Sequence, residues 1–235
     1  MPEKELTLVG HLAELRKRII YCLIPFLLTV VSSVPFAKAL LFFLRIPAQG
    51  VIEKLAFFSP QEVVLVYLKI SLFSGLILSL PVILYQIWGF IQPALEEKHK
   101  RFALSFIFWT LLAFLAGCAF GYLFLTPISL KFLLAIAGGE LTPVISLSKY
   151  LSFVLALVLG CGLVFQTPVL IWILAKLKIV NPEFLRKKRK YAYALLLIAA
   201  AIVTPTTDPF NMCLLAVPMI LLYEIGIWVS RWNQK

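Results

Sequence analysis

The residues of this chain whose side chains could do chemistry are few, and the most suggestive are acidic. Glu14 lies in the segment HLAELRKR (11–18), and Glu96 and Glu97 lie in FIQPALEEKHKR (90–101), each among basic residues. Each carboxylate has a basic residue four positions later, which is the spacing of an ion pair along a helix. A second interpretation is a site for a cationic peptide, because a carboxylate can hold a guanidinium by two parallel hydrogen bonds. The residues alone favour the local ion pairs.

The side chains on which membrane enzymes and metal sites depend are absent from the apolar segments. The two histidines, His11 and His99, lie in polar flanking segments, and the four cysteines are scattered singly without metal-ligand spacing. A serine nucleophile needs a base beside it, and a zinc site needs clustered thiolates or imidazoles. We therefore predict that the protein is not an enzyme and that it binds no cofactor and no metal.

The composition indicates that these few polar residues stand in a membrane protein. Hydrophobic residues make up 62% of the 235 residues, charged residues make up 14%, and the mean hydropathy is +0.98. Soluble domains average about 45–50% apolar and about 25% charged residues, so a soluble enzyme and a disordered chain are excluded. The net charge of +11 comes from basic residues that flank apolar runs, which is typical of membrane topology signals rather than of nucleic-acid binding.

Apolar runs between charged residues predict an all-α, polytopic membrane protein that forms one domain over residues 1–235. A helix needs about 20 residues to cross the hydrocarbon core. The predicted six transmembrane helices cover approximately residues 19–37, 66–92, 102–128, 150–176, 191–204 and 210–229, and the external loops cover approximately 38–65, 129–149 and 205–209. Prolines inside the spans predict kinks, which either serve packing alone or give the bundle a concave face.

The distribution of lysine and arginine predicts the orientation. Sixteen of the 22 basic residues lie on the side that carries both termini, and six lie on the opposite side. The positive-inside rule places the richer side, and with it both termini, in the cytoplasm. The fifth span is short: about 14 residues rise about 21 Å, against about 30 Å of hydrocarbon. This length predicts either a locally thin bilayer or a turn that water reaches.

The order of several motifs resembles that of the TatC family, the multi-spanning receptor subunit of the twin-arginine protein translocase. Each motif is weak alone, but together they run in order through nearly the whole chain. They are HLAELRKRI (11–19), FFSPQE (57–62), PVILYQIWGFIQPALEE (81–97), GYLFLTP (121–127), SKYLSF (148–153), NPEFLRKKRKY (181–191), TPTTDPF (204–210) and AVPMILLYEIGI (216–227).

The resemblance implies a receptor for signal peptides that bear paired arginines and belong to folded cargo proteins. In the family, a glutamate of the N-terminal motif and one after the second span bind the arginine pair, which implies these roles for Glu14 and for Glu96 or Glu97. Neighbouring recognition positions match Arg16, Phe90 and Leu95. Further functional candidates are His11, Pro47, Pro60, Tyr122, Gln166 and Asp208.

Gln166 departs from the family pattern, because many members carry a glutamate within the fourth span. An amide still hydrogen-bonds a polar partner in lipid. The resemblance further implies single-span TatA- and TatB-type partners, self-association in the complex, a location in the cell (inner) membrane and export driven by the proton gradient. The alternative function is a secondary transporter of a small solute, which would predict pseudo-symmetric halves and a polar midplane site. The sequence displays neither feature.

Overall fold

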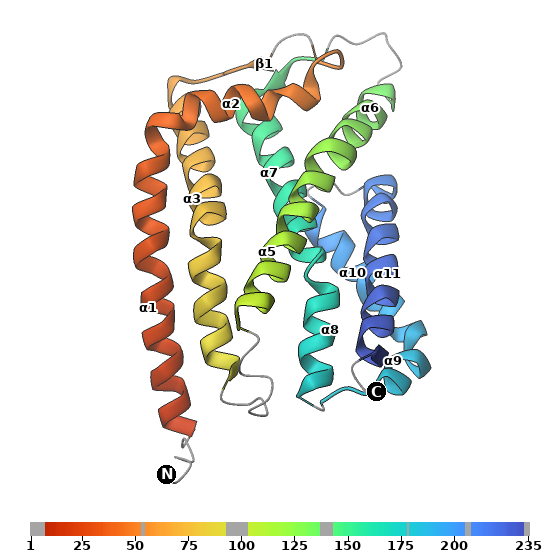
Figure 1. Cartoon of the computed structure of the whole chain (residues 1–235). Coiled ribbons are helices and arrows are strands. Elements are labelled where there is room, and N and C mark those ends of the chain that lie inside the picture. The colour runs from red at the N-terminus through yellow and green to blue at the C-terminus, as the bar shows by residue number, and fades with distance from the viewer. Residues whose placement is uncertain are drawn as a thin grey trace.

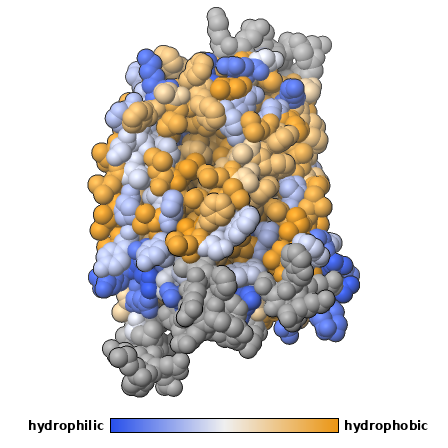
Figure 2. Space-filling view, in the orientation of Figure 1, coloured by the Kyte–Doolittle hydropathy of each residue, from blue (hydrophilic) through white to orange (hydrophobic). Residues whose placement is uncertain are grey.

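The protein is a bundle of long apolar helices. The computed structural model describes residues 8–52, 55–92, 103–136, 143–177, 179–204 and 208–232. Within these residues, five helical segments are long and apolar enough to cross a membrane: Leu12–Ala48, Pro60–Ile91, Leu104–Ile136, Leu147–Lys176 and Pro209–Ser230. On the face seen in Figure 2, a hydrophobic band occupies the middle of the molecule and hydrophilic residues gather towards both ends. The predicted all-α membrane fold is confirmed.

The first two long helices pack side by side. Helix α1 covers Leu8–Ser33 and helix α3 covers Pro60–Ile91. The hydroxyl of Thr29 in α1 donates to the carbonyl oxygen of Gly75 in α3 at 2.8 Å. A Cβ atom on Gly75 would lie 2.8 Å from the backbone nitrogen of Val30, so this glycine lets the two backbones approach. The first helix begins eleven residues before the predicted span, and Glu14 therefore lies on a helix.

The connection between α1 and α3 forms a roof across one end of the bundle (Figure 1). It contains the 3₁₀ turn η1 (Val34–Phe36), helix α2 (Ala37–Arg45), the 3₁₀ turn η2 (Ile46–Ala48) and strand β1 (Leu55–Ala56). The prolines at 35 and 47 each stand in the first turn of a 3₁₀ segment. The amide groups of a first turn have no helical acceptor, so a proline costs no hydrogen bond at these positions. We call this end of the molecule the α2 end.

A small parallel pairing joins the two segments that were predicted to be external, at the α2 end. Strand β1 pairs with β2 (Ile145–Ser146), with Leu55 opposite Ile145 and Ala56 opposite Ser146. The carboxylate of Glu62, in the first turn of α3, accepts hydrogen bonds from the amide of Phe58 at 2.8 Å, from the amide of Ser148 at 2.9 Å and from the hydroxyl of Ser146. One carboxylate thus ties the start of α3 to the segment that follows β2.

The third predicted span is longer than expected. Helix α5 (Ala103–Phe120) continues through a π turn, η4 (Gly121–Leu125), into α6 (Thr126–Ile136). The helix therefore continues beyond the predicted span 102–128 to Ile136, into the segment 129–149 that was predicted as an external loop. Where this span leaves the bilayer stays a prediction. Pro127 lacks an amide hydrogen, and the wider π turn before it lets the helix continue past the proline.

The fourth predicted span is two helices rather than one. Two residues separate helix α7 (Leu147–Val164) from helix α8 (Thr167–Lys176), which has Pro168 in its first turn. Helices α5 and α7 lie in close contact, because a Cβ atom on Gly117 would stand 2.5 Å from the carbonyl oxygen of Cys161. The break between α7 and α8 places Gln166 at the N-cap position of α8.

The last three helices complete the bundle. They are α9 (Pro182–Lys187), α10 (Arg189–Val203) and α11 (Pro209–Trp232). Helix α1 begins and α11 ends at the same end of the molecule, opposite the α2 end (Figure 1). Helix α10 has 15 residues, which rise about 22 Å, and it is the predicted fifth span. That α10 crosses the bilayer, and that the shared end is cytoplasmic, stay predictions.

Candidate functional site

Three of the predicted recognition residues lie at the end opposite the α2 end, where α1 begins and α3 finishes. Glu14 and Arg16 lie on α1, and Phe90 lies half-buried in the last turn of α3. Leu95, Glu96 and Glu97 lie outside the described residues, as does the side chain of His11. The packing of α1 against α3 therefore brings the N-terminal motif close to the segment that precedes the second acidic cluster.

Glu14 already holds a guanidinium group. The Nε and Nη2 atoms of Arg18 donate to Oε1 of Glu14 at 2.9 and 2.5 Å. Both side chains are 24% exposed, so the ion pair is partly withdrawn from water. The local pairing that the sequence favoured for Glu14 is confirmed at the spacing expected along a helix.

The same guanidinium crosses from α1 to α3. Nη2 of Arg18 donates to the carbonyl oxygen of Gly89 at 2.8 Å, and Nη1 approaches the backbone and side-chain oxygens of Gln86 at 3.4 and 3.5 Å. The sequence predicted Arg18 only as the local ion-pair partner of Glu14, and it did not predict that Gln86 and Gly89 belong to the site. One signal was available in the sequence: residue 93, four positions after Gly89, is a proline, which offers no amide hydrogen to the Gly89 carbonyl.

Two further basic residues of the N-terminal motif point elsewhere. Arg16 and Lys17 are exposed, and Nζ of Lys17 stands 5.7 Å from the ring centre of Tyr21. The helix therefore separates one half-buried cation, Arg18, from two exposed ones. Arg16 stays a predicted recognition residue.

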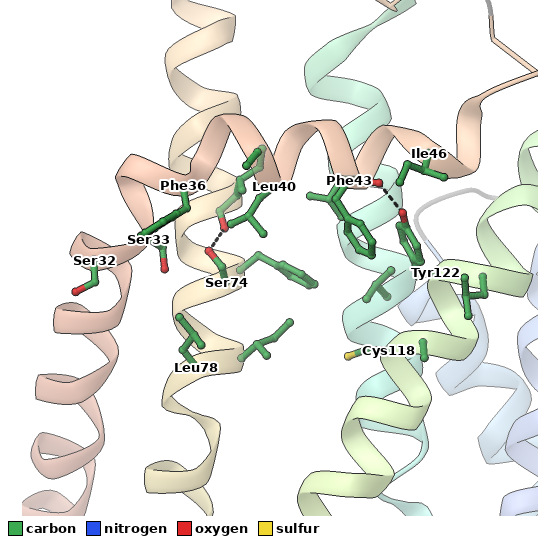
Figure 3. A pocket seen from close by; sticks show the side chains of 18 residues that line it. Ser32, Ser33, Phe36, Leu40, Phe43, Ile46, Ser74, Leu78, Cys118 and Tyr122 are labelled. Carbon is green, nitrogen blue, oxygen red and sulfur yellow. Dashed lines mark hydrogen bonds between the residues drawn. The ribbon is translucent and has the colours of Figure 1, made fainter.

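At the α2 end, predicted functional residues support the roof. The hydroxyl of Tyr122 donates to the carbonyl oxygen of Phe43 at 2.5 Å, and the two rings stack with their centres 4.8 Å apart (Figure 3). Tyr150 donates to the neighbouring carbonyl oxygen of Leu44 at 2.8 Å. Pro47 is half-buried in η2, and Pro60 is the exposed first residue of α3. Tyr122 and Tyr150 thus fix the position of α2 over the bundle.

An apolar cavity of about 970 Å³ lies beneath that roof. Its walls come from the end of α1, from α2, from α3 and from the α5–η4 region, and they include Phe36, Leu40, Phe43, Leu78 and Cys118 (Figure 3). The serine hydroxyls at its edge are paired within their own helices, because Ser32, Ser33 and Ser74 donate to the carbonyl oxygens of Leu28, Thr29 and Ile70. The cavity therefore offers apolar surface rather than polar recognition.

Gln166 sits at the break between α7 and α8 with one of its two polar atoms paired. Its Nε2 atom donates to the carbonyl oxygen of Thr110 in α5 at 3.1 Å. Its Oε1 atom is buried and accepts no hydrogen bond from any part of the chain that the structure describes. A buried acceptor without a donor costs about 1–3 kcal/mol, so this arrangement is unfavourable unless another molecule supplies the donor.

The predicted site residue Asp208, and a second acidic residue of the last hairpin, Glu224, have partners in the chain. Asp208 accepts from the backbone amide of Asn211 at 2.7 Å and from its side-chain nitrogen at 2.9 Å, so it caps the start of α11. Glu224 in α11 pairs with Arg189 and accepts from the hydroxyl of Tyr193 at 2.6 Å, which joins α11 to α10. The turn residues 205–207 lie outside the described residues.

Comparison with known proteins identifies the family. The model of the family described as Sec-independent protein translocase protein (TatC) matches residues 10–218. The chain belongs to the TatC family. It is 37% identical to the TatC protein of Carboxydothermus hydrogenoformans, over 99% of this chain and 96% of that protein. It is 38% identical to TatC of Aquifex aeolicus, over 95% of this chain and 94% of that protein.

The structural comparison agrees with the family assignment. A crystal structure of the twin-arginine translocase receptor TatC matches with a TM-score of 0.85 and 37% identity, covering 96% of this chain and all of that chain. The resemblance inferred from the eight motifs is thus confirmed. The protein is a multi-pass membrane protein and a receptor subunit of the twin-arginine translocase, and its family is not enzymatic.

Proposed function

We propose that this receptor binds the paired arginines of signal peptides at the Glu14 end of α1 and α3. The observation that carries the proposal is the Glu14 carboxylate, which holds a guanidinium in a setting only 24% exposed. Hydrogen bonds to charged groups contribute about 1.5–3 kcal/mol each, and they are strongest when water is partly excluded. Arg16, Phe90, Leu95, Glu96 and Glu97 complete the proposed site.

The apolar stretch of such a peptide has a suitable surface farther along the bundle. Ser32, at the edge of the apolar cavity, follows Glu14 by eighteen positions in the same helix, which is about 27 Å. A helical apolar segment of about eighteen residues, starting at the bound arginines, reaches that cavity. Since the hydroxyls at its edge are already paired, the cavity suits an apolar segment. It gives no support to the alternative function, a transporter of a polar solute.

The remaining residues are proposed to serve assembly and topology. The unpaired Oε1 of Gln166 suits a polar side chain of a single-span TatA- or TatB-type subunit, because a buried acceptor in lipid favours an intermolecular donor. Pro47, Pro60, Tyr122 and Asp208 shape the opposite end, and His11 belongs to the recognition motif. We place the protein in the cell (inner) membrane with both termini in the cytoplasm. In the translocase it also associates with copies of itself, and the proton gradient drives export.

The test is peptide binding to the purified receptor in detergent. Glu14→Gln, and separately the pair Glu96→Gln and Glu97→Gln, should weaken binding of a fluorescent twin-arginine peptide about ten- to hundredfold, the equivalent of one charged hydrogen bond. The control is Glu183→Gln, because Glu183 is an exposed carboxylate in the first turn of α9, and it should bind as the wild type does. Unchanged binding after all three site substitutions would overturn the proposal.

A further inference from the structure

We infer that Glu14, Gln86 and Gly89 form a guanidinium seat, which Arg18 occupies in the resting receptor and vacates for one arginine of the signal peptide. This inference rests on the proposed function and names the acceptors that the arginine would meet. The guanidinium seat is defined as the carboxylate of Glu14, the carbonyl oxygens of Gly89 and Gln86, and the side-chain oxygen of Gln86.

The seat fits a guanidinium by its geometry. All three nitrogens of the Arg18 head are engaged: Nε with Glu14, Nη2 with Glu14 and Gly89, and Nη1 with Gln86. A planar fork of five N–H donors can reach acceptors on several sides at once, whereas a lysine ammonium is a compact point charge with three donors. The acceptors therefore favour arginine over lysine as an occupant.

Helix α3 provides the seat whether or not Arg18 fills it. The Gly89 carbonyl lies in the last turn of α3, where carbonyl oxygens are free of helical partners and the helix dipole attracts cations. Residue 93 is a proline, so it has no amide hydrogen to offer. A Cβ atom at residue 89 would stand 3.0 Å from Cζ and 3.2 Å from Nη2 of Arg18. Glycine is thus the residue that leaves room for the guanidinium plane.

The present occupant is easy to exchange. Glu14 and Arg18 are four residues apart on one helix, and ion pairs at this spacing stabilise a helix only modestly. A signal peptide presents two adjacent guanidinium groups. One of them takes the place of Arg18 in the seat, and the second adds a further cation near the acidic residues. The alternative is that Arg18 permanently braces α1 against α3. The two views predict opposite effects when Arg18 is removed.

Peptide binding to four purified proteins in one detergent distinguishes the views: wild type, Arg18→Met, Lys17→Met and Gly89→Ala. Lys17→Met is the matched control, because it removes the same charge from the next residue, which is exposed. Arg18→Met should bind a twin-arginine peptide about three- to tenfold more tightly than Lys17→Met, because the intramolecular guanidinium that competes for the seat is gone. Gly89→Ala should bind more weakly than the wild type, because the new methyl group fills the seat.

A brace predicts weaker binding for both Arg18→Met and Gly89→Ala, and that result would overturn the inference. A different result would refute the proposed function itself: the single variant Glu14→Gln would then bind the peptide as tightly as the wild type does. If Glu14→Gln weakens binding but Arg18→Met binds no more tightly than Lys17→Met, only the exchange at the seat is refuted.

A second measurement needs no peptide. Truncation by Arg18→Ala empties the seat, and ethylguanidinium should then raise the melting temperature of this variant more than ethylammonium at the same concentration. The gain should disappear in the double variant Arg18→Ala, Glu14→Gln. An equal response to the two cations, or a gain that survives Glu14→Gln, would show that no guanidinium seat exists.

Discussion

Replacing Gln166 by methionine should stop export without destabilising the receptor. The side chain of Gln166 donates from Nε2 to the Thr110 carbonyl oxygen at 3.1 Å, and its Oε1 atom is buried without a donor in the described part of the chain. Methionine has nearly the same length and fills the space between α5 and α8. The substitution thus removes both the favourable hydrogen bond of Nε2 and the unfavourable burial of the unpaired Oε1 atom.

The two contributions can be compared. The lost hydrogen bond between neutral groups contributes about 0.5–1.5 kcal/mol, whereas the unpaired buried oxygen costs about 1–3 kcal/mol. Central values predict a gain in the free energy of unfolding of about 1 kcal/mol, which raises the melting temperature by about 2–4 °C in a chain of this size. A loss of export in so stable a variant would assign the Gln166 oxygen to a partner molecule.

The assay pairs thermal unfolding in detergent with export of a twin-arginine reporter from cells that carry only the variant. Thr110→Val is the control: it removes the hydroxyl that donates to Phe106 but keeps the carbonyl oxygen that Gln166 uses, and it should export normally. Gln166→Glu should retain more export than Gln166→Leu, because it keeps a polar oxygen. Normal export by Gln166→Met would show that the Gln166 oxygen has no role in export, and a melting temperature several degrees below the wild type would show that the amide is structural.

Other substitutions test the packing around the site by thermal unfolding. Gly117→Ala should lower the free energy of unfolding by about 1–3 kcal/mol, because the new methyl group overpacks against the backbone of α7. The control Ala116→Ser, at an exposed position of the same helix, should be neutral. Equal melting temperatures for the two variants would contradict the close contact between α5 and α7. Tyr122→Phe keeps the stacked ring but loses the bond to α2, at a cost of about 1 kcal/mol, and Tyr122→Ala should cost more. Asp208→Ala should cost about 0.5–2 kcal/mol as a lost helix cap, while Asp208→Asn should restore most of that stability; an Asn variant as unstable as Ala would refute the capping role.

The helices of the fold could be predicted from sequence because a membrane span must be a long apolar segment. Runs of apolar residues bounded by charges identify these segments, and in lipid such a segment must be helical to satisfy its backbone hydrogen bonds. The boundaries were less predictable: charge patterns suggested that one helix ended near residue 128, yet a π turn carries it to Ile136. Proline position alone does not reveal whether a helix bends, as at Pro127, or breaks, as at Pro168.

The site was only half predictable for a related reason. The pairing of Glu14 with Arg18 follows from their spacing in sequence, but the contacts of Arg18 with Gln86 and Gly89 join positions 68 and 71 residues apart. Such contacts depend on the rotation of α1 against α3, which no local pattern determines. The same holds for Glu62, whose hydrogen bonds reach Ser146 and Ser148, 84 and 86 residues later in the chain.

The most direct test of the account is a double-mutant cycle between receptor and peptide. Binding is measured for wild type and Glu14→Gln with a twin-arginine peptide and with the same peptide carrying glutamine in place of each arginine in turn. The account predicts that Glu14→Gln costs the twin-arginine peptide at least tenfold in affinity and costs one of the singly substituted peptides almost nothing, because that peptide lacks the guanidinium that Glu14 binds. An equal loss of affinity for all three peptides would show that Glu14 acts through the fold and not through an arginine, and would contradict the central claim.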